Sequence, residues 1–258
     1  MTTITKEAGA RIALGDLYSW TALGCVLTAF LGFIPTFWTP LVAGTFAANP
    51  VVFMHGIGFF TWTLFALAQT SLVPAGRVAL HRSVGLAGIS FATLLTVLGL
   101  LAALNSLQSG IAAGQAGGAE AFLIVPLTVI VPFAVLFTFA IANIRRPESH
   151  KRLMLLATVS VLNAPVARPL IVWVFKFPPT EQLPVWIDIP ACYLSYLLFV
   201  PALIHDWRTR GRIHPVYMIA VPILVLIPLA VMPISDTAAW HGFAKGFAAL
   251  AGSHPGTP

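Results

Sequence analysis

Residues 83–104 have the sequence SVGLAGISFATLLTVLGLLAAL, which contains no charged residue and no proline. At a rise of about 1.5 Å per residue, a helix of this length crosses the roughly 30 Å hydrocarbon layer of a bilayer. The apolar residues follow one another continuously, whereas in a strand of a membrane β-barrel they would alternate with polar residues. This stretch therefore predicts a membrane-spanning helix.

Apolar runs of similar length occur at six other places: 17–38, 51–73, 123–144, 153–175, 185–206 and 216–234. Together the runs predict an all-α fold, a single seven-helix transmembrane domain that covers residues 1–234. Only 9% of the residues are charged and 58% are hydrophobic, whereas an average soluble domain is about 25% charged. This composition excludes a water-soluble globular enzyme. It also excludes a disordered chain, which needs high charge and few apolar residues.

The lysines and arginines divide unevenly between the two ends of the predicted bundle. Eleven lie in the N-terminal segment or at the connections after the second, fourth and sixth runs: Lys6, Arg11, Arg77, Arg82, Arg145, Arg146, Lys151, Arg152, Arg208, Arg210 and Arg212. Only Lys176 and Lys245 lie in the other connections and the tail. Cytoplasmic loops are enriched in lysine and arginine, so we expect a cytoplasmic N-terminus and an external C-terminus. The net charge of +6 then needs no nucleic-acid partner.

Two segments outside the runs have their own patterns. The connection Asn105–Ala121 is rich in glycine and alanine, and we expect it to be mobile. The tail 235–258 has apolar side chains at near-helical spacing, with Ser235 or Asp236 available as a cap: Trp240, Phe243, Phe247 and Leu250. Such a pattern is typical of an interfacial helix on the outer leaflet. The alternative is a frayed polar tail, because the segment also contains glycines.

Polar residues at membrane depth are costly, so each is a candidate for function. His55 lies about one turn into the run 51–73, and Arg168 lies between Pro165 and Pro169, which interrupt their helix and free main-chain carbonyls. Asp188 occupies a similar depth in the next run. Two interpretations follow. Arg168 and Asp188 form an ion pair, or Arg168 and His55 line a cavity that binds an anionic group such as a propionate or a lipid headgroup.

The cytoplasmic ends of the runs carry a second set of polar residues. His81, His150 and His205 lie at the ends of three different helices, at one predicted membrane level. Gln69 lies on the same helix face as His55, roughly 20 Å away. Imidazoles that converge from different helices are suited to a haem iron or a metal ion. The alternative is that these histidines, each close to arginine, lysine or aspartate, anchor the helix ends at the headgroups.

Several kinds of membrane protein are excluded by missing residues. No lysine lies within a run, so a retinal Schiff base is excluded, and no arginine repeats at every third position as in a voltage sensor. No phosphate-binding loop, nucleophile elbow or pair of catalytic carboxylates is present. The two cysteines, Cys25 and Cys192, form no metal-binding spacing.

Two motifs are similar to those of a known group of proteins. His55 is followed by Gln69 and by HRSVG at 81–85, and later by RPESHKRLM at 146–154. These motifs resemble a broad group of uncharacterised bacterial multi-pass inner-membrane proteins, which have a histidine and a glutamine in one helix, His-Arg-x-x-Gly opening the next, and a later Arg-Pro-x-x-His-x-Arg-x-Met. The resemblance covers about half of the chain and implies that four residues belong to one site system: His55, Gln69, His81 and His150.

Three functional hypotheses follow from these residues. The first is a haem-b-binding or quinone-linked redox protein, with His81 and His150 as axial ligands. In this hypothesis His55 serves a second, outer site, with Arg168 near the acidic groups bound there. Its partners are the lipid bilayer and a quinone or redox partner. The second is a non-catalytic assembly, accessory or lipid-binding protein. The third is a membrane-embedded hydrolase in which His81, His150 and His205 bind zinc.

Overall fold

The structure is a computed structural model that describes residues 16–47, 49–178 and 181–250. Every regular element within these ranges is helical, so the predicted all-α fold is confirmed. Seven helical segments are long and apolar enough to cross a membrane: Leu17–Val42, Pro50–Leu72, Val78–Ala112, Ala116–Ala142, Pro147–Val174, Val185–Arg210 and Pro215–Ser235. Each coincides with one of the seven predicted spans.

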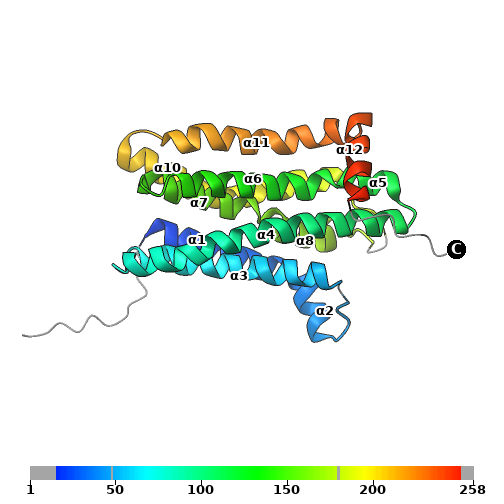
Figure 1. Ribbon diagram of the computed structural model, residues 1–258, viewed down its shortest axis with the longest axis horizontal. Coiled ribbons are helices and arrows are strands. Elements are labelled where there is room, and N and C mark those ends of the chain that lie inside the picture. The colour runs from blue at the N-terminus through cyan, green and yellow to red at the C-terminus, as the bar shows by residue number, and fades with distance from the viewer. Residues whose placement is uncertain (1–15, 48, 179–180, 251–258) are drawn as a thin grey trace, which may run out of the picture.

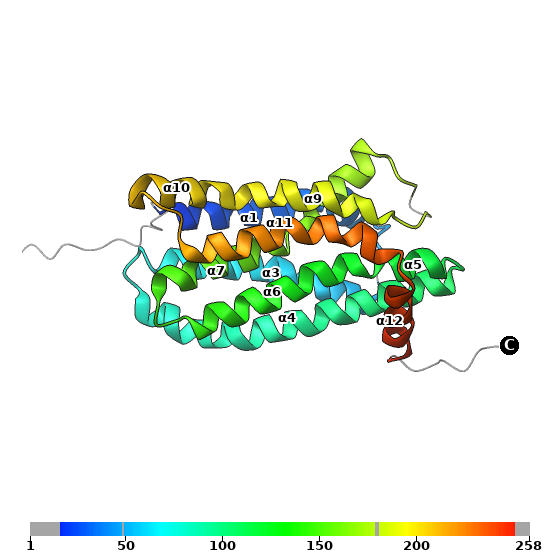
Figure 2. The ribbon, with the colours of Figure 1, turned by 90° about the horizontal axis from the view of Figure 1, so that it is seen from above.

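Three of the seven spans are single uninterrupted helices: α3 (Pro50–Leu72), α4 (Val78–Ala112) and α11 (Pro215–Ser235). The spans run side by side along the long axis of the molecule (Figures 1 and 2). The connections 73–77, 143–146 and 211–214 lie at one end, which is on the left in Figure 1. Because these connections and the helix ends beside them contain most of the arginines and lysines of the described chain, we call this end the cation-rich end.

The other four spans change helix type or direction along their length. The first consists of α1 (Leu17–Gly32), a π-helical turn (Ile34–Trp38) and α2 (Thr39–Val42), and the fourth of α5 (Ala116–Phe122) and α6 (Ile124–Ala142). The fifth consists of α7 (Pro147–Ser160), α8 (Asn163–Pro169) and a π-helical turn (Leu170–Val174). The sixth consists of a 3₁₀ turn (Val185–Ile187), α9 (Asp188–Tyr196), a 3₁₀ turn (Leu197–Phe199) and α10 (Val200–Arg210).

The fifth span lies at the centre of the bundle. Leu156, Ala157 and Val159 of α7 are fully buried. Around α7, Trp62 of α3 packs edge-to-face against Phe133 of α6, with ring centroids 5.2 Å apart. Large apolar side chains on the outer helices are instead exposed: Leu86, Leu94, Met218, Ile219 and Leu226. Soluble monomers rarely expose apolar patches of this extent, so this surface suits a lipid environment.

The prediction of a mobile connection at 105–121 was wrong. α4 continues to Ala112 and α5 begins at Ala116, so only residues 113–115 separate the two helices. Alanine is the best helix former, and the extension has an apolar face to bury. Leu107 is 2% exposed and packs in one cluster with Ala119 and Leu123.

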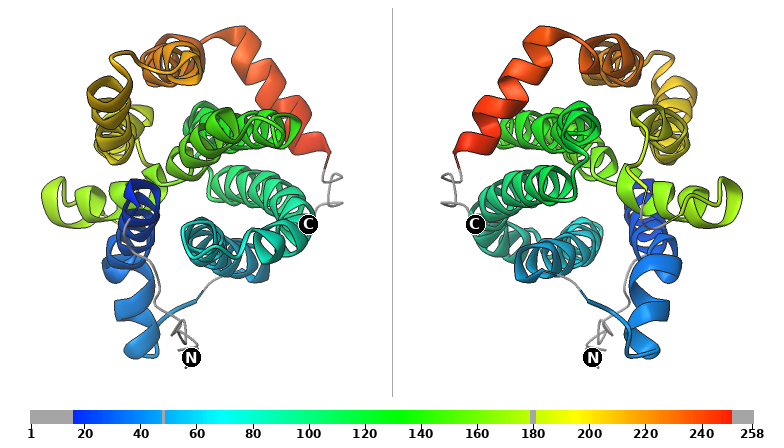
Figure 3. Two further views of the ribbon diagram at one scale, coloured as in Figure 1. Left: turned by 90° about the vertical axis from the view of Figure 1, so that its left-hand side faces the viewer. Right: turned by 90° about the vertical axis from the view of Figure 1, so that its right-hand side faces the viewer.

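The tail forms a helix, α12 (Ala238–Ala249), which lies across the end of the bundle opposite the cation-rich end (Figure 3). The predicted cap was wrong, because Thr237 rather than Ser235 or Asp236 caps this helix: the Thr237 hydroxyl accepts from the Trp240 N–H at 3.2 Å. The frayed alternative is also wrong for residues 238–249. Glu120 of α5 fixes the helix, since its carbonyl accepts from Trp240 Nε1 at 2.8 Å and its carboxylate lies 2.7 Å from His241 Nδ1. Residues 251–258 lie outside the described ranges.

Candidate functional site

The polar residues at membrane depth form two separate groups. One group, at the cation-rich end, contains His81 and His150, which we call the histidine pair. The other lines a cavity in the opposite half of the bundle and contains His55 and Arg168. The structure therefore divides the four residues expected at the cofactor sites into two pairs.

The histidine pair joins two helices that begin at the same end of the bundle. His81 lies in the first turn of α4 and His150 in the first turn of α7, and their ring centroids are 6.4 Å apart with the ring planes at 79°. His81 Nδ1 lies 3.2 Å from the Gln69 carbonyl oxygen, and His150 Nδ1 lies 2.9 Å from the Ala140 carbonyl oxygen. A carbonyl oxygen can only accept a hydrogen bond. Both Nδ1 atoms therefore donate to main-chain carbonyls, and in the neutral imidazole this leaves the Nε2 lone pair as the acceptor.

Gln69 adds an unsatisfied side chain to this group. Its side chain is 8% exposed, and within the described chain neither its Nε2 nor its Oε1 has a hydrogen-bond partner. A side chain added at Gly85 would meet only the Gln69 amide, at 3.9 Å, so the α4 backbone leaves space beside it. Buried polar groups are rarely left without a partner. The Gln69 amide is therefore a polar group available to a partner from outside the described chain.

His205 does not join the histidine pair. It lies on the exposed face of α10, and within the ranges that the structure describes no three histidine, cysteine, aspartate or glutamate side chains are close enough to share a metal ion. The expected zinc-binding trio of His81, His150 and His205 is therefore not formed. Three helix ends at one membrane level can face in different directions around the bundle, and a single sequence does not define those directions.

A buried charge network lies at the cation-rich end. The sequence indicated that Asp206 could pair with the arginines that follow it, and Arg210 Nε lies 3.8 Å from its carboxylate, but the role of Arg152 was not foreseen. The Arg152 side chain is 1% exposed, and its guanidinium forms ion pairs with Asp206 of α10, which is fully buried, and with Glu148 one turn earlier. Glu148 also pairs with Arg210, and with Lys151 at 2.9 Å. The i,i+4 spacing of Glu148 and Arg152 was a usable signal. The contact with Asp206, 54 residues away, had none.

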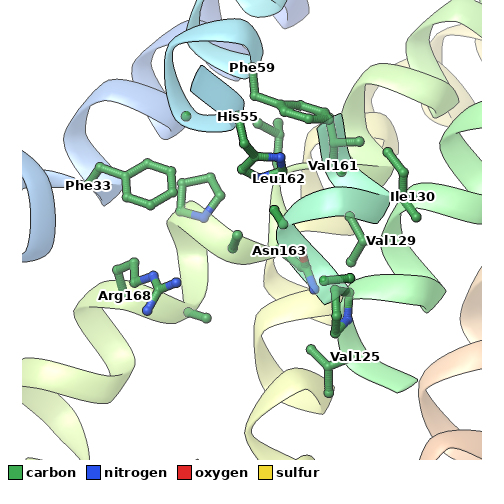
Figure 4. A pocket seen from close by; sticks show the side chains of 18 of the residues that line it. Phe33, His55, Phe59, Val125, Val129, Ile130, Val161, Leu162, Asn163 and Arg168 are labelled. Carbon is green, nitrogen blue, oxygen red and sulfur yellow. The ribbon is translucent and has the colours of Figure 1, made fainter. Parts of the chain in front are cut away.

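The cavity in the opposite half has a volume of about 310 Å³ and is not sealed from the surroundings. Its walls come from α1, α3, α4, α6 and α8, and they are mostly apolar (Figure 4). The break between α7 and α8 at residues 161–162 creates part of this space, because the chain there leaves the helical path just before Asn163 and Pro165. The Pro165 carbonyl of α8 packs directly against Gly32 of α1.

The expected ion pair between Arg168 and Asp188 does not form. Asp188 instead accepts a short hydrogen bond from the Asn163 amide and lies 3.4 Å from the Cys192 thiol, which is one turn further along α9. Asn163 begins α8 and faces the start of α9, whereas Arg168 is five residues further along α8. Arg168 is left without a hydrogen bond or an ion pair among the described residues.

The second interpretation of this region, a shared cavity, agrees with the structure. His55 and Arg168 both line the cavity. His55 Nδ1 and Asn163 Oδ1 are buried and have no partner in the described chain. Figure 4 shows His55 on α3 across the space from Asn163 and Arg168 on α8. The cavity thus combines one cation and two unsatisfied polar atoms with the Asp188 carboxylate, which is bonded to Asn163, in mostly apolar walls.

The chain matches no protein-family model, no curated protein sequence and no solved structure. The function must therefore be argued from the two groups of residues themselves.

Proposed function

We propose that this chain is a haem-b-binding redox protein of a bacterial inner membrane, with His81 and His150 as the axial ligands. The observation that carries the proposal is the histidine pair with both Nδ1 atoms directed at main-chain carbonyls. Metal-binding histidines usually donate their other ring N–H to a carbonyl or a carboxylate, which fixes the ring and the tautomer. Both imidazoles here are held in this way.

The spacing of the pair supports the same ligand role. A metal–nitrogen bond to histidine is about 2.0–2.1 Å, and the ring centre lies roughly 1 Å beyond the nitrogen. His81 and His150, with ring centroids 6.4 Å apart, would be close enough to hold one metal ion between them. The two ligands come from different helices, as in other bis-histidine haem sites within bundles.

Three neighbours of the pair support the proposal. Gln69 supplies an unpaired buried amide beside His81, and Gly85 keeps the neighbouring backbone free of a side chain. Arg82 is exposed in the same turn as His81, where a cation suits a propionate. A bound haem supplies one-electron transfer, and a membrane quinone or a small redox protein is the expected electron partner.

The test is an absorption spectrum of the protein, purified in detergent after expression with ample haem supply, before and after dithionite. We expect a Soret band with α and β bands on reduction, at about one haem per chain. His81→Ala and His150→Ala should each lose the bis-histidine spectrum, whereas His205→Ala, at the same end but outside the pair, should keep it. A featureless spectrum, or one unchanged in both His81→Ala and His150→Ala, would refute the assignment.

We further propose that the cation-rich end faces the cytoplasm, which puts the N-terminus inside and α12 on the outer surface. The support is the enrichment of lysine and arginine in cytoplasmic loops. An alkaline phosphatase fused after α12 should be active, and a green fluorescent protein at the same position should be dark. The opposite pair of results would reverse the topology and place the histidine pair outside.

A non-catalytic or lipid-binding protein is the main alternative, and a preparation without any chromophore would favour it. In that case the histidine pair would not be a cofactor site, but the cavity in the opposite half of the bundle would remain a candidate binding site. The zinc hydrolase is not proposed, because no observation on His205 supports it.

A further inference from the structure

We propose that the cavity beside α8 binds the anionic head group of a single-chain amphiphile, a carboxylate or a phosphate monoester on an apolar tail, with Arg168 as its counter-ion. This inference does not depend on haem at the histidine pair, since the two groups of residues lie in opposite halves of the bundle and share no side chain.

The first argument is the charge of Arg168. Charged side chains within spans almost always pair with one another or with main-chain carbonyls, yet Arg168 has no partner among the described residues. The nearest acid that lines the same cavity, Asp188, is committed to Asn163 and Cys192. An anion from outside the chain supplies the counter-charge that Arg168 lacks within the described chain.

The second argument is the pair of unsatisfied polar atoms. Asn163 is 4% exposed, and its Oδ1 needs a donor, while the buried His55 Nδ1 can donate or accept. A phosphate monoester monoanion has both acceptor oxygens and a hydroxyl donor, whereas a carboxylate can accept from Arg168 and His55 but cannot donate to Asn163. A phosphate head group can therefore satisfy Arg168, His55 and Asn163 together, which a purely apolar ligand cannot do.

The third argument is the shape and lining of the space. Phe33, Phe59, Val129 and Ile171 contribute apolar wall, which suits a tail and not a free inorganic ion. A volume of about 310 Å³ lies at the small end of ligand pockets, roughly 300–1,000 Å³. It suits one head group with the start of one chain. Because the cavity is not sealed, the rest of the tail can leave it towards the lipid.

The test is equilibrium dialysis of radiolabelled dodecanoate and dodecyl phosphate against the protein in dodecyl maltoside, with empty micelles as background and dodecanol as the neutral probe. We expect saturable binding of one anionic probe per chain and no saturable binding of dodecanol. A preference for dodecyl phosphate points to a phosphate head group, and a preference for dodecanoate points to a free fatty acid. If dodecanol binds as well as the anions, the anionic assignment is overturned.

Arg168→Gln is the decisive variant. Removing one charge-assisted hydrogen bond should weaken binding of the anionic probes by roughly tenfold or more. Arg208→Gln removes an exposed arginine at the other end of the bundle and should leave binding unchanged. Equal binding by Arg168→Gln and the wild type would refute the role of Arg168.

A second variant covers the case in which Arg168→Gln does not fold. Gly56 lines the cavity, and a Cβ added there meets no atom within 4 Å, so we expect Gly56→Leu to extend into the cavity and fill it. We expect Gly56→Leu to abolish saturable binding. Gly246→Leu on α12, also in open space, should not affect it. Unchanged binding by Gly56→Leu would mean that the probes bind elsewhere, which overturns the proposal.

The haem assignment and the amphiphile assignment can be refuted independently of each other. His81→Ala should lose the haem spectrum and keep probe binding, whereas Arg168→Gln should keep the spectrum and lose probe binding. Loss of both properties in either variant, with the protein still folded, would contradict the independence of the two sites.

Discussion

Arg152 and Arg168 lie sixteen residues apart on the same span, and their surroundings are opposite. Arg152 is 1% exposed and is fully matched, with Asp206 and Glu148 both bonded to its guanidinium. Arg168 lies beside an interruption of its helix, in mostly apolar walls, and has no acid bonded to it within the described chain. The first arginine joins α7 to α10, whereas the second faces an open space.

The comparison distinguishes a charge that stabilises the fold from a charge that is available to bind a ligand. A buried charge that is paired within the chain needs nothing further, and its loss harms the fold. A charge at membrane depth with no internal partner costs stability and is retained where a ligand or a pathway uses it. The two arginines should therefore respond in opposite directions to removal of their charge, and this contrast can be tested.

The largest expected effect is at Arg152. Arg152→Gln leaves the fully buried Asp206 without its main partner, since Arg210 Nε lies 3.8 Å from the same carboxylate and is only a secondary contact. Breaking one side of a buried pair typically costs about 3–5 kcal/mol. The free energy of unfolding in an SDS titration should fall by this amount. Arg208→Gln, with an exposed arginine, is the matched control and should change little.

At Arg168 the expected sign is reversed. Arg168→Met replaces an unpaired charge by an apolar side chain of similar length in apolar walls. In the absence of added amphiphile, the variant should be more stable than the wild type by roughly 1–3 kcal/mol, the scale of the insertion penalty for an arginine in a membrane. Thermal unfolding can be followed by a thiol-reactive dye, because Cys25 and Cys192 are both free and buried. A lower unfolding temperature for Arg168→Met would mean that Arg168 is structural, like Arg152.

A pair of glycines tests the two sides of the cavity wall. At Gly32, an added Cβ would overlap the Pro165 carbonyl, so Gly32→Ala must push α1 away from α8. Overpacking of this kind costs about 1–3 kcal/mol. At Gly56, an added Cβ meets nothing, so Gly56→Ala should be neutral or stabilising by up to about 1 kcal/mol, the helix propensity difference. The same dye assay measures both. Equal effects would indicate that the wall is not fixed as described.

Hydrophobic runs predicted the fold well, because each backbone group in a bilayer needs an internal partner and an apolar run of twenty residues has few alternatives to a helix. All seven spans were found. The connection 105–121 was missed because its alanines and glycines resemble a loop in composition, and because its helices pack against α12, which lies far away in sequence.

The candidate sites were predicted in part, for a similar reason. His81 and His150 were expected to meet, and His55 and Arg168 to share a cavity, because depth along a helix follows from counting residues. The direction in which a side chain faces around the bundle axis does not follow from counting residues. For this reason His205 was wrongly expected beside the histidine pair, and Asp188 bonds to Asn163 and not to Arg168.

The smallest expected effect concerns the pH dependence of stability at the cation-rich end, where His214 caps α11. Its Nδ1 accepts from the Val216 N–H at 3.2 Å, so the cap needs the neutral imidazole. Burial, and then the charge of Arg152, lower the pKa of His214 below its usual 6.5; the other charged groups that act on it are Asp206, Arg210 and Glu148. The folded protein therefore binds fewer protons than the unfolded chain just below pH 6.5.

The contribution of His214 should be complete above about pH 7 and should be lost as the pH falls through 6.5 towards the lowered pKa. The loss should not exceed about 1 kcal/mol, the value of an N-cap. His214→Asn keeps a side-chain acceptor at the cap and removes the titrating group, so its unfolding temperature should fall less between pH 7.5 and pH 5.5 than that of the wild type. Parallel pH profiles for the two proteins would show that His214 does not contribute to the pH dependence of stability. The acidic residues paired with Arg152 would then have to be substituted one at a time to find the group that does.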